Sequence, residues 1–176
     1  MKTINLMKYI LLLCALGLCM FSCKSKDGYF RMPELDFRSD AYFFRAVGSA
    51  EDAAMQTAKA KAVHLAKLDI AKSMGSVMEA TVKNYLGSAN NGDSQDRFEQ
   101  ISRETVRQSL VDVRLKDLVY KREKNGNFSC IAFVEMPVQE VSGRFARLGA
   151  ESVQLDKELF EQEYNRALST INSREL

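Results

Sequence analysis

The sequence predicts an α+β domain: a mostly antiparallel sheet covered on one face by helices, in the order β-α-β-α-β-β-α plus a C-terminal helix. Two observations carry this prediction. Apolar and polar residues alternate on both sides of an Asn-Gly pair at 125–126, which is typical of a β-hairpin. Longer segments on either side of it repeat apolar residues at intervals of three and four, which is typical of amphipathic helices.

The first strand is predicted over 42–47, an aromatic and β-branched segment that stops at Gly48. Ser49 has the chemistry of a helix N-cap, and Asp52 follows three residues later as in a capping box. A helix is therefore expected over about 50–73. Its inner face should lie close to the sheet because most of its side chains are small: Ala54, Ala58, Ala62, Leu65 and Ala66.

The middle of the chain predicts a second strand, a loop and a second helix. Gly75 is expected to end the first helix, and 76–86 then alternates apolar with polar residues, as a half-buried strand does. Residues 87–93 are rich in Gly, Ser and Asn and predict a loop. A helix is expected from about Ser94, with these residues on its inner side: Phe98, Ile101, Thr105 and Val106.

The hairpin follows. In its first strand, apolar and polar residues alternate from Val111. After a bulge, the pattern continues through Leu118 and Tyr120. The turn is 124–127, and the second strand, 128–135, is mostly apolar on both faces, so we expect it to be central in the sheet. Cys130 lies in this strand, where a thiol is usually a small buried apolar group.

Two helical segments end the chain. Pro137 opens the first, which has apolar residues at helical spacing and is expected to break at Gly149. The final helix is predicted over about 151–171. Its apolar side is formed by Leu155, Leu159, Phe160, Tyr164, Leu168 and Ile171.

The N-terminal residues have the pattern of an export signal. Lys2 and Lys8 precede an uncharged segment of thirteen residues, 9–21, which is shorter than the ~20 residues that a membrane-spanning helix needs. Ser22 and Cys23 follow directly. Met20 to Cys23 resembles the lipobox of bacterial lipoproteins, which implies cleavage between Ser22 and Cys23 and attachment of diacylglycerol and a further acyl chain, such as palmitate, to Cys23. An ordinary secreted protein and a short uncleaved anchor are the alternatives.

These features divide the chain into four parts. Residues 1–22 form the lipoprotein signal, 23–40 a lipidated N-terminus and flexible tether, 41–148 the α+β domain and 149–176 a C-terminal helical extension. The tether would hold the domain roughly 20 Å from its anchor. The residue after Cys23 is Lys and not Asp, and by resemblance to bacterial sorting signals this implies the outer membrane. Asp27 alone does not form the acid-rich segment that signals surface export in some bacteria, so the periplasmic side is favoured and the cell surface is the alternative.

Composition and single residues argue against several functions. The net charge of +2 includes the two signal lysines, so the mature chain is about neutral and lacks the basic excess of a nucleic-acid-binding protein. His64 is the only histidine and lies opposite the alanine stripe, so we expect it to be exposed and expect neither a metal site nor a catalytic triad. Asp69 is in line with Ala58, Ala62 and Leu65, so we expect its side chain to be half-buried and to form an ion pair with a basic residue.

Three motifs together resemble a known family: the segment 46–49 (Ala-Val-Gly-Ser), the alanine stripe, and the strand ending 131–135 (Ile-Ala-Phe-Val-Glu). With the lipobox, they are similar to the twenty-kilodalton outer-membrane lipoprotein family. The resemblance covers about 44–141 and implies location and architecture but no catalytic residues or cofactor.

The leading hypothesis is therefore a non-enzymatic, lipid-anchored binding or assembly module for another envelope component. A cell-wall synthase and an outer-membrane or secretion assembly are candidate partners. Two alternatives stay open. One is a small-ligand carrier. The other is an envelope glycan hydrolase that uses acidic residues of the last helix, which are Glu158, Glu161 and Glu163.

Overall fold

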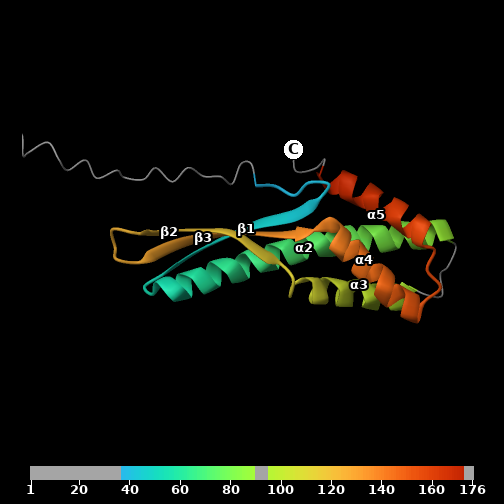
Figure 1. The fold of residues 1–176 in the computed structure, drawn as a ribbon, viewed down its shortest axis with the longest axis horizontal. Coiled ribbons are helices and arrows are strands. Elements are labelled where there is room, and N and C mark those ends of the chain that lie inside the picture. The colour runs from blue at the N-terminus through green and yellow to red at the C-terminus, as the bar shows by residue number, and fades with distance from the viewer. Residues whose placement is uncertain (1–36, 90–94, 173–176) are drawn as a thin grey trace, which may run out of the picture. The chain divides into compact units, whose positions relative to one another are not determined.

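The structure is a computed structural model that describes residues 37–89 and 95–172. The elements are β1 (Phe43–Asp52), α2 (Met55–Ala89), α3 (Gln95–Ser109), β2 (Arg114–Arg122), β3 (Phe128–Pro137), α4 (Val138–Ser152) and α5 (Lys157–Asn172). The α+β class is confirmed (Figure 1). Within the described residues, no helix combines the length and apolar character needed to cross a membrane.

The sheet has three antiparallel strands in the order β1-β3-β2. The predicted central position of β3 is confirmed, and so is the bulge in β2, which lies between Leu115 and Asp117. Gly126 closes the hairpin with a φ of +91°, a left-handed conformation that favours glycine. The inner face of β3, which packs on α2, carries Cys130, Ala132, Val134 and Met136.

Helix α2 runs for 35 residues, so the strand predicted over 76–86 and the break at Gly75 are both wrong. The residues after Gly75 fit two patterns at once. Apolar and polar residues alternate, as in a strand, but apolar residues also recur at the intervals of three and four that a helix requires. The buried positions continue the alanine stripe at intervals of three and four through Ile70, Met74, Val77, Met78, Thr81, Val82 and Tyr85. A single helical glycine costs only about 1 kcal/mol, which this buried stripe outweighs.

The predicted N-cap at Ser49 is also wrong, because β1 continues to Asp52. Gly48 lies within β1 at its closest approach to α2. A Cβ atom there would lie 2.2 Å from the Ala62 carbonyl oxygen and 2.3 Å from the Ala66 nitrogen. The glycine therefore allows contact between strand and helix instead of ending the strand. Of the predicted inner face, Ala58, Ala62 and Ala66 are buried, whereas Ala54 and Leu65 are exposed.

The helices α3, α4 and α5 pack with the second half of α2 around an aromatic core. The Phe145 and Phe160 rings stack with centroids 4.3 Å apart, and Tyr85, Phe98 and Tyr164 surround them. Helix α4 passes through the predicted break at Gly149 and ends at Ser152. Helix α5 packs on α2, so the C-terminal extension predicted for 149–176 is part of this core as far as it is described.

Candidate binding surfaces

The predicted lipidation site lies outside the described residues. Ser22 and Cys23 both precede Phe37, so cleavage and lipid attachment stay predictions from the sequence. His64 is exposed, as predicted. In the part of the chain that the structure describes, no three His, Cys, Asp or Glu side chains gather as a metal site would require.

The acidic candidates lie differently from what the sequence predicts. Asp69 is exposed and has no ion pair among the described residues, because α2 turns this position toward the open edge of β1 and away from the buried stripe. Glu158 and Glu161 are exposed on α5. Glu163 is buried, and its carboxylate accepts hydrogen bonds of 3.1 Å from Arg166 one turn later.

Cys130 is buried in β3, as predicted. Burial raises the pKa of its thiol, against a smaller opposite effect of the nearby Lys59. Because the thiolate is the reactive form, this environment favours an inert side chain.

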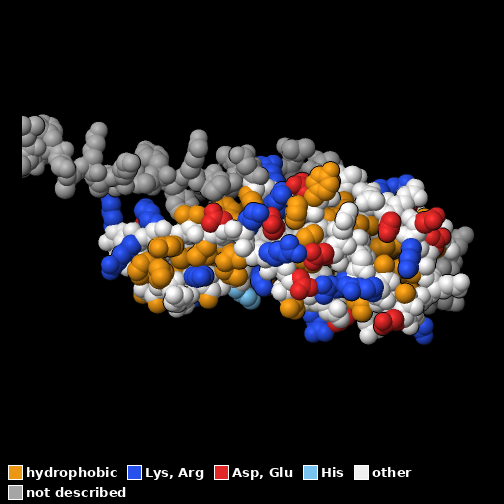
Figure 2. Space-filling view, in the orientation of Figure 1, with side chains coloured by type: hydrophobic (Ala, Val, Ile, Leu, Met, Phe, Trp, Pro, Cys, Tyr) orange, Lys and Arg blue, Asp and Glu red, His pale blue; other side chains and the backbone are white. Residues whose placement is uncertain are grey.

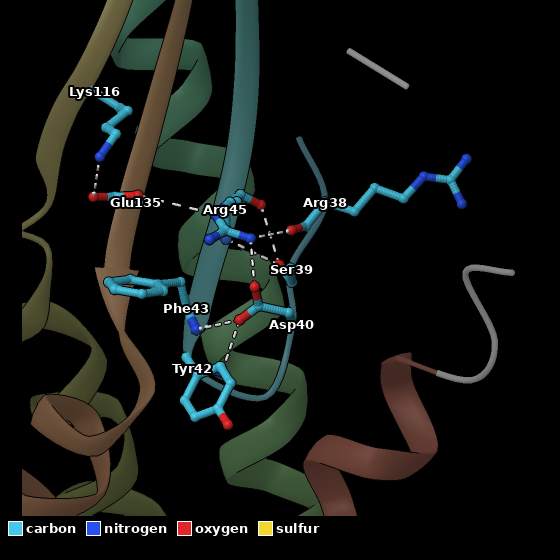
Figure 3. Close-up of polar contacts among 8 residues, drawn as sticks. All are labelled: Arg38, Ser39, Asp40, Tyr42, Phe43, Arg45, Lys116 and Glu135. Atoms are coloured by element: carbon cyan, nitrogen blue, oxygen red, sulfur yellow. Dashed lines mark hydrogen bonds and ion pairs between the residues drawn. The ribbon is translucent and has the colours of Figure 1, made fainter. Parts of the chain in front are cut away.

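Arg45 is the centre of a polar cluster on the outer face of the sheet, which we name the Arg45 clasp (Figure 3). Its guanidinium donates to the Asp40 carboxylate at 2.6 Å and to the Arg38 carbonyl at 3.0 Å. It also lies 3.9 Å from Glu135, which forms a second ion pair of 3.4 Å with Lys116. The clasp therefore joins β1, β2 and β3 to the residues before β1.

Backbone contacts complete the clasp. The Ser39 hydroxyl accepts from the Arg45 N–H at 2.9 Å and donates to the Arg45 carbonyl at 3.2 Å. Asp40 accepts from the N–H groups of Tyr42 and Phe43. Residues 37–40, predicted as the end of a flexible tether, are thus held against the outer face and edge of β1.

The pKa of Asp40 reflects this binding. Partial burial raises it, but the two backbone donors and Arg45 together outweigh burial, so the pKa of the carboxyl lies below its ordinary value. Asp40 is therefore charged at neutral pH and holds Arg45. Because the pair is half exposed, it fixes geometry more than it adds stability.

An exposed apolar surface lies on the other side of the sheet, where β2 projects beyond α2. We name it the β2–α2 surface, and it comprises the exposed Leu115 and Tyr120 and the half-buried Val63, Leu118 and Phe128. Leu115 is 44% exposed and Tyr120 58% exposed. Figure 2 shows apolar side chains gathered over the hairpin and the first half of α2, with basic side chains at the border.

Three basic side chains lie near this surface. Lys59 lies close enough to Cys130 to affect its thiol, and Lys67 donates to the Leu110 carbonyl at 3.2 Å, just before β2. The Arg122 guanidinium lies 5.6 Å from the centre of the Phe128 ring. An apolar floor with a basic border is suited to a ligand that is both apolar and acidic.

A groove of about 790 Å³ lies between α2 and α3. Its apolar floor is Val82, Leu86 and Val106. Its rim is charged or polar and includes Glu79, Lys83, Glu99 and Arg103. The candidate glutamates Glu158, Glu161 and Glu163 do not line it.

Sequence reasoning missed both the Arg45 clasp and the β2–α2 surface. The clasp joins residues from three strands whose register is set only in the folded sheet. A signal for the surface was present in Leu115, Leu118 and Tyr120, which share one face of β2, but the sequence does not show where α2 leaves that face open.

No family model matches the chain, and searches of the curated proteins and of the solved structures give no match. The resemblance to the twenty-kilodalton outer-membrane lipoprotein family is therefore an inference from the sequence motifs alone.

Proposed function

We propose that this chain is a bacterial lipoprotein, anchored in the outer membrane through lipid on Cys23, whose domain binds another envelope protein and catalyses no reaction. The lipobox-like segment ending at Cys23 supports the anchor. The α+β fold is the architecture that the family resemblance implies. The observation that carries the binding role is the β2–α2 surface.

A soluble domain rarely leaves large apolar side chains together on one face, and such patches commonly mark binding sites. Leu115 and Tyr120 project from the same face of β2, opposite the buried Val134 and Cys130 of β3. Tyrosine is enriched at interfaces because it combines a large apolar ring with a polar hydroxyl. The basic border favours a partner segment with apolar side chains and a negative charge.

The hydrolase alternative has weaker support. A glycosidase needs two carboxyl groups that face each other across a cleft, about 5 to 9.5 Å apart. Glu163 is buried against Arg166, whereas Glu158 and Glu161 lie on the exposed side of α5. This arrangement is typical of a helix surface rather than of a catalytic pair.

The groove between α2 and α3 is the one observation that favours a small-ligand carrier. Its volume lies within the 300–1,000 Å³ of ordinary ligand pockets. Its rim is charged, however, and only three apolar side chains form its floor. A purified chain that retains a lipid or metabolite would support this candidate, and Val106→Trp should then abolish retention.

The binding role is tested by photo-crosslinking in intact cells with a photoreactive residue in place of Tyr120. The matched control carries it in place of Tyr42, an exposed tyrosine at the opposite end of the domain's sheet, before β1. We expect one dominant adduct from position 120 and none from position 42, and Leu115→Lys should abolish the adduct. Equal labelling from both positions, or an adduct that Leu115→Lys leaves unchanged, would contradict the proposal.

A further inference from the structure

Along the edge of β1 that faces away from β3, the backbone groups of a short stretch have no partner among the described residues. The N–H and C=O of Arg45 bond to Ser39, and the C=O of Phe43 accepts from the Asp40 N–H, so at these residues the backbone points away from β3. In an antiparallel pair the direction of the backbone N–H and C=O groups alternates from one residue to the next. Those of Val47, Ser49 and Glu51 therefore also point away from β3. The outward backbone N–H and C=O groups of these three residues have no hydrogen-bond partner among the described residues.

The two edges of the sheet differ in how they are protected against pairing. The β2 edge carries charges along its length, at Arg114, Lys116, Asp117, Lys121 and Arg122. Charged side chains, lysine above all, protect an edge strand from pairing with another chain. Beyond Arg45, the β1 edge has the sequence Val-Gly-Ser-Ala over 47–50 and carries no charge until Glu51. It is therefore the edge that is open to strand addition.

We propose that two copies of this chain associate through β1, edge to edge and antiparallel, with Ser49 opposite Ser49 of the second copy, and so join their sheets into one of six strands. This inference goes beyond the proposed function and uses a different surface.

Three features favour a second copy of this chain as the strand that pairs with the β1 edge. The open stretch is bounded by the Arg45 clasp on one side and by the end of β1 at Asp52 on the other, so its centre is Ser49. It can therefore pair over its full length with the same stretch of a second copy. In this register Val47 faces Glu51 of the second copy, so no acid opposes an acid. The three residue pairs would form about six backbone hydrogen bonds.

Helix α2 provides apolar area at the same place. Asp69 lines the same hollow as Val47 and Ser49, so this flank of α2 faces the β1 edge. Leu65 lies one turn earlier on that flank and is 46% exposed. Strands joined by a two-fold axis normal to the sheet place both α2 helices on the same face. The two Leu65 side chains would therefore approach each other and lose their exposure to water.

The test uses charge exchange at Ser49 in the full-length, lipidated chain. Two copies with different tags are expressed together, solubilised in detergent and purified through one tag. Ser49 is exposed, so Lys and Glu are both compatible with the fold. We expect wild-type copies to co-purify. Ser49→Lys with Ser49→Lys, and Ser49→Glu with Ser49→Glu, should fall to background, because like charges then face each other.

Mixing a Ser49→Lys copy with a Ser49→Glu copy should restore co-purification, which also shows that both variants fold. The matched control is Ser152, an exposed serine at the end of α4, where the same changes should have no effect. A Ser49→Cys chain should also form a disulfide-linked homodimer, because directly opposed residues lie about 5.5 Å apart between Cα atoms.

Several outcomes overturn the proposal. Co-purification of two Ser49→Lys copies at the wild-type level would place the contact elsewhere. Cross-linking of Ser49→Cys to Tyr120→Cys, but not to itself, would indicate head-to-tail pairing of β1 with β2. Loss of a different protein on Ser49→Lys, without self-association of the wild type, would assign the edge to that partner. Each result is independent of whether Tyr120 labels a partner.

Discussion

Replacing Gly48 by alanine tests the contact on which the sheet–helix packing depends. The added Cβ would lie 2.2 Å and 2.3 Å from backbone atoms of Ala62 and Ala66, whereas an ordinary contact needs about 3.4 Å. Backbone atoms do not rotate away as side chains do, so β1 and α2 must separate by about 1 Å. Overpacking of this kind costs typically 1–3 kcal/mol, and we expect about 3 kcal/mol here. For a domain of this size, that lowers Tm by about 10 °C.

Gly75→Ala is the matched control, because the same chemical change is expected to have the opposite effect. No atom outside the local helix lies within 4 Å of a Cβ at this position. Alanine in a helix interior stabilises by about 0.5–1 kcal/mol relative to glycine. The assay is urea unfolding of residues 24–176, followed by circular dichroism. A Gly48→Ala free energy of unfolding within 0.5 kcal/mol of wild type would refute the close contact.

Three further predictions follow from the core and the clasp. Phe160→Ala should cost about 3–5 kcal/mol in the same unfolding assay, because its ring stacks on Phe145; a cost below 1 kcal/mol would show that α5 is not part of the core. Burial raises the pKa of Tyr164 above its ordinary value of 10.0, so above pH 10 the folded chain keeps a phenol proton that the unfolded chain loses. The free energy of unfolding should therefore fall as the pH rises above 10, and it should fall less in Tyr164→Phe. Arg45→Met should speed trypsin cleavage after Arg38, because Ser39 and the residues beside it lose the clasp; an unchanged rate would contradict its role.

Much of the fold could be predicted from local patterns. The hairpin follows from its Asn-Gly turn, and the central place of β3 follows from apolar residues on both faces. Prediction failed at Gly48, Gly75 and Gly149, each of which was interpreted as a break. Gly48 is needed for close packing, and Gly75 lies inside a helix whose buried face continues past it. Gly149 is the last buried residue of α4, which continues with exposed residues as far as Ser152. A glycine marks a break only where tertiary packing does not favour continuation.

The candidate surfaces were less predictable, for a physical reason. The exposure of His64 and the burial of Cys130 follow from helix and strand periodicity, and both predictions are confirmed. Asp69 was expected to be half-buried because it continues an apolar row. The buried stripe drifts around α2 along its length, however, so the row leaves the interior before Asp69. The Arg45 clasp depends on strand register, which periodicity does not encode.

We propose that lipid on Cys23 holds a binding domain on the outer membrane. The most direct test is fractionation of cells that express the wild-type chain or Cys23→Ser, grown with labelled palmitate. We expect the wild type to carry label and to sediment with the outer membrane, and Cys23→Ser to carry no label and not to reach that membrane. A Cys23→Ser chain that fractionates with the outer membrane like the wild type, or a wild type without label, would contradict it.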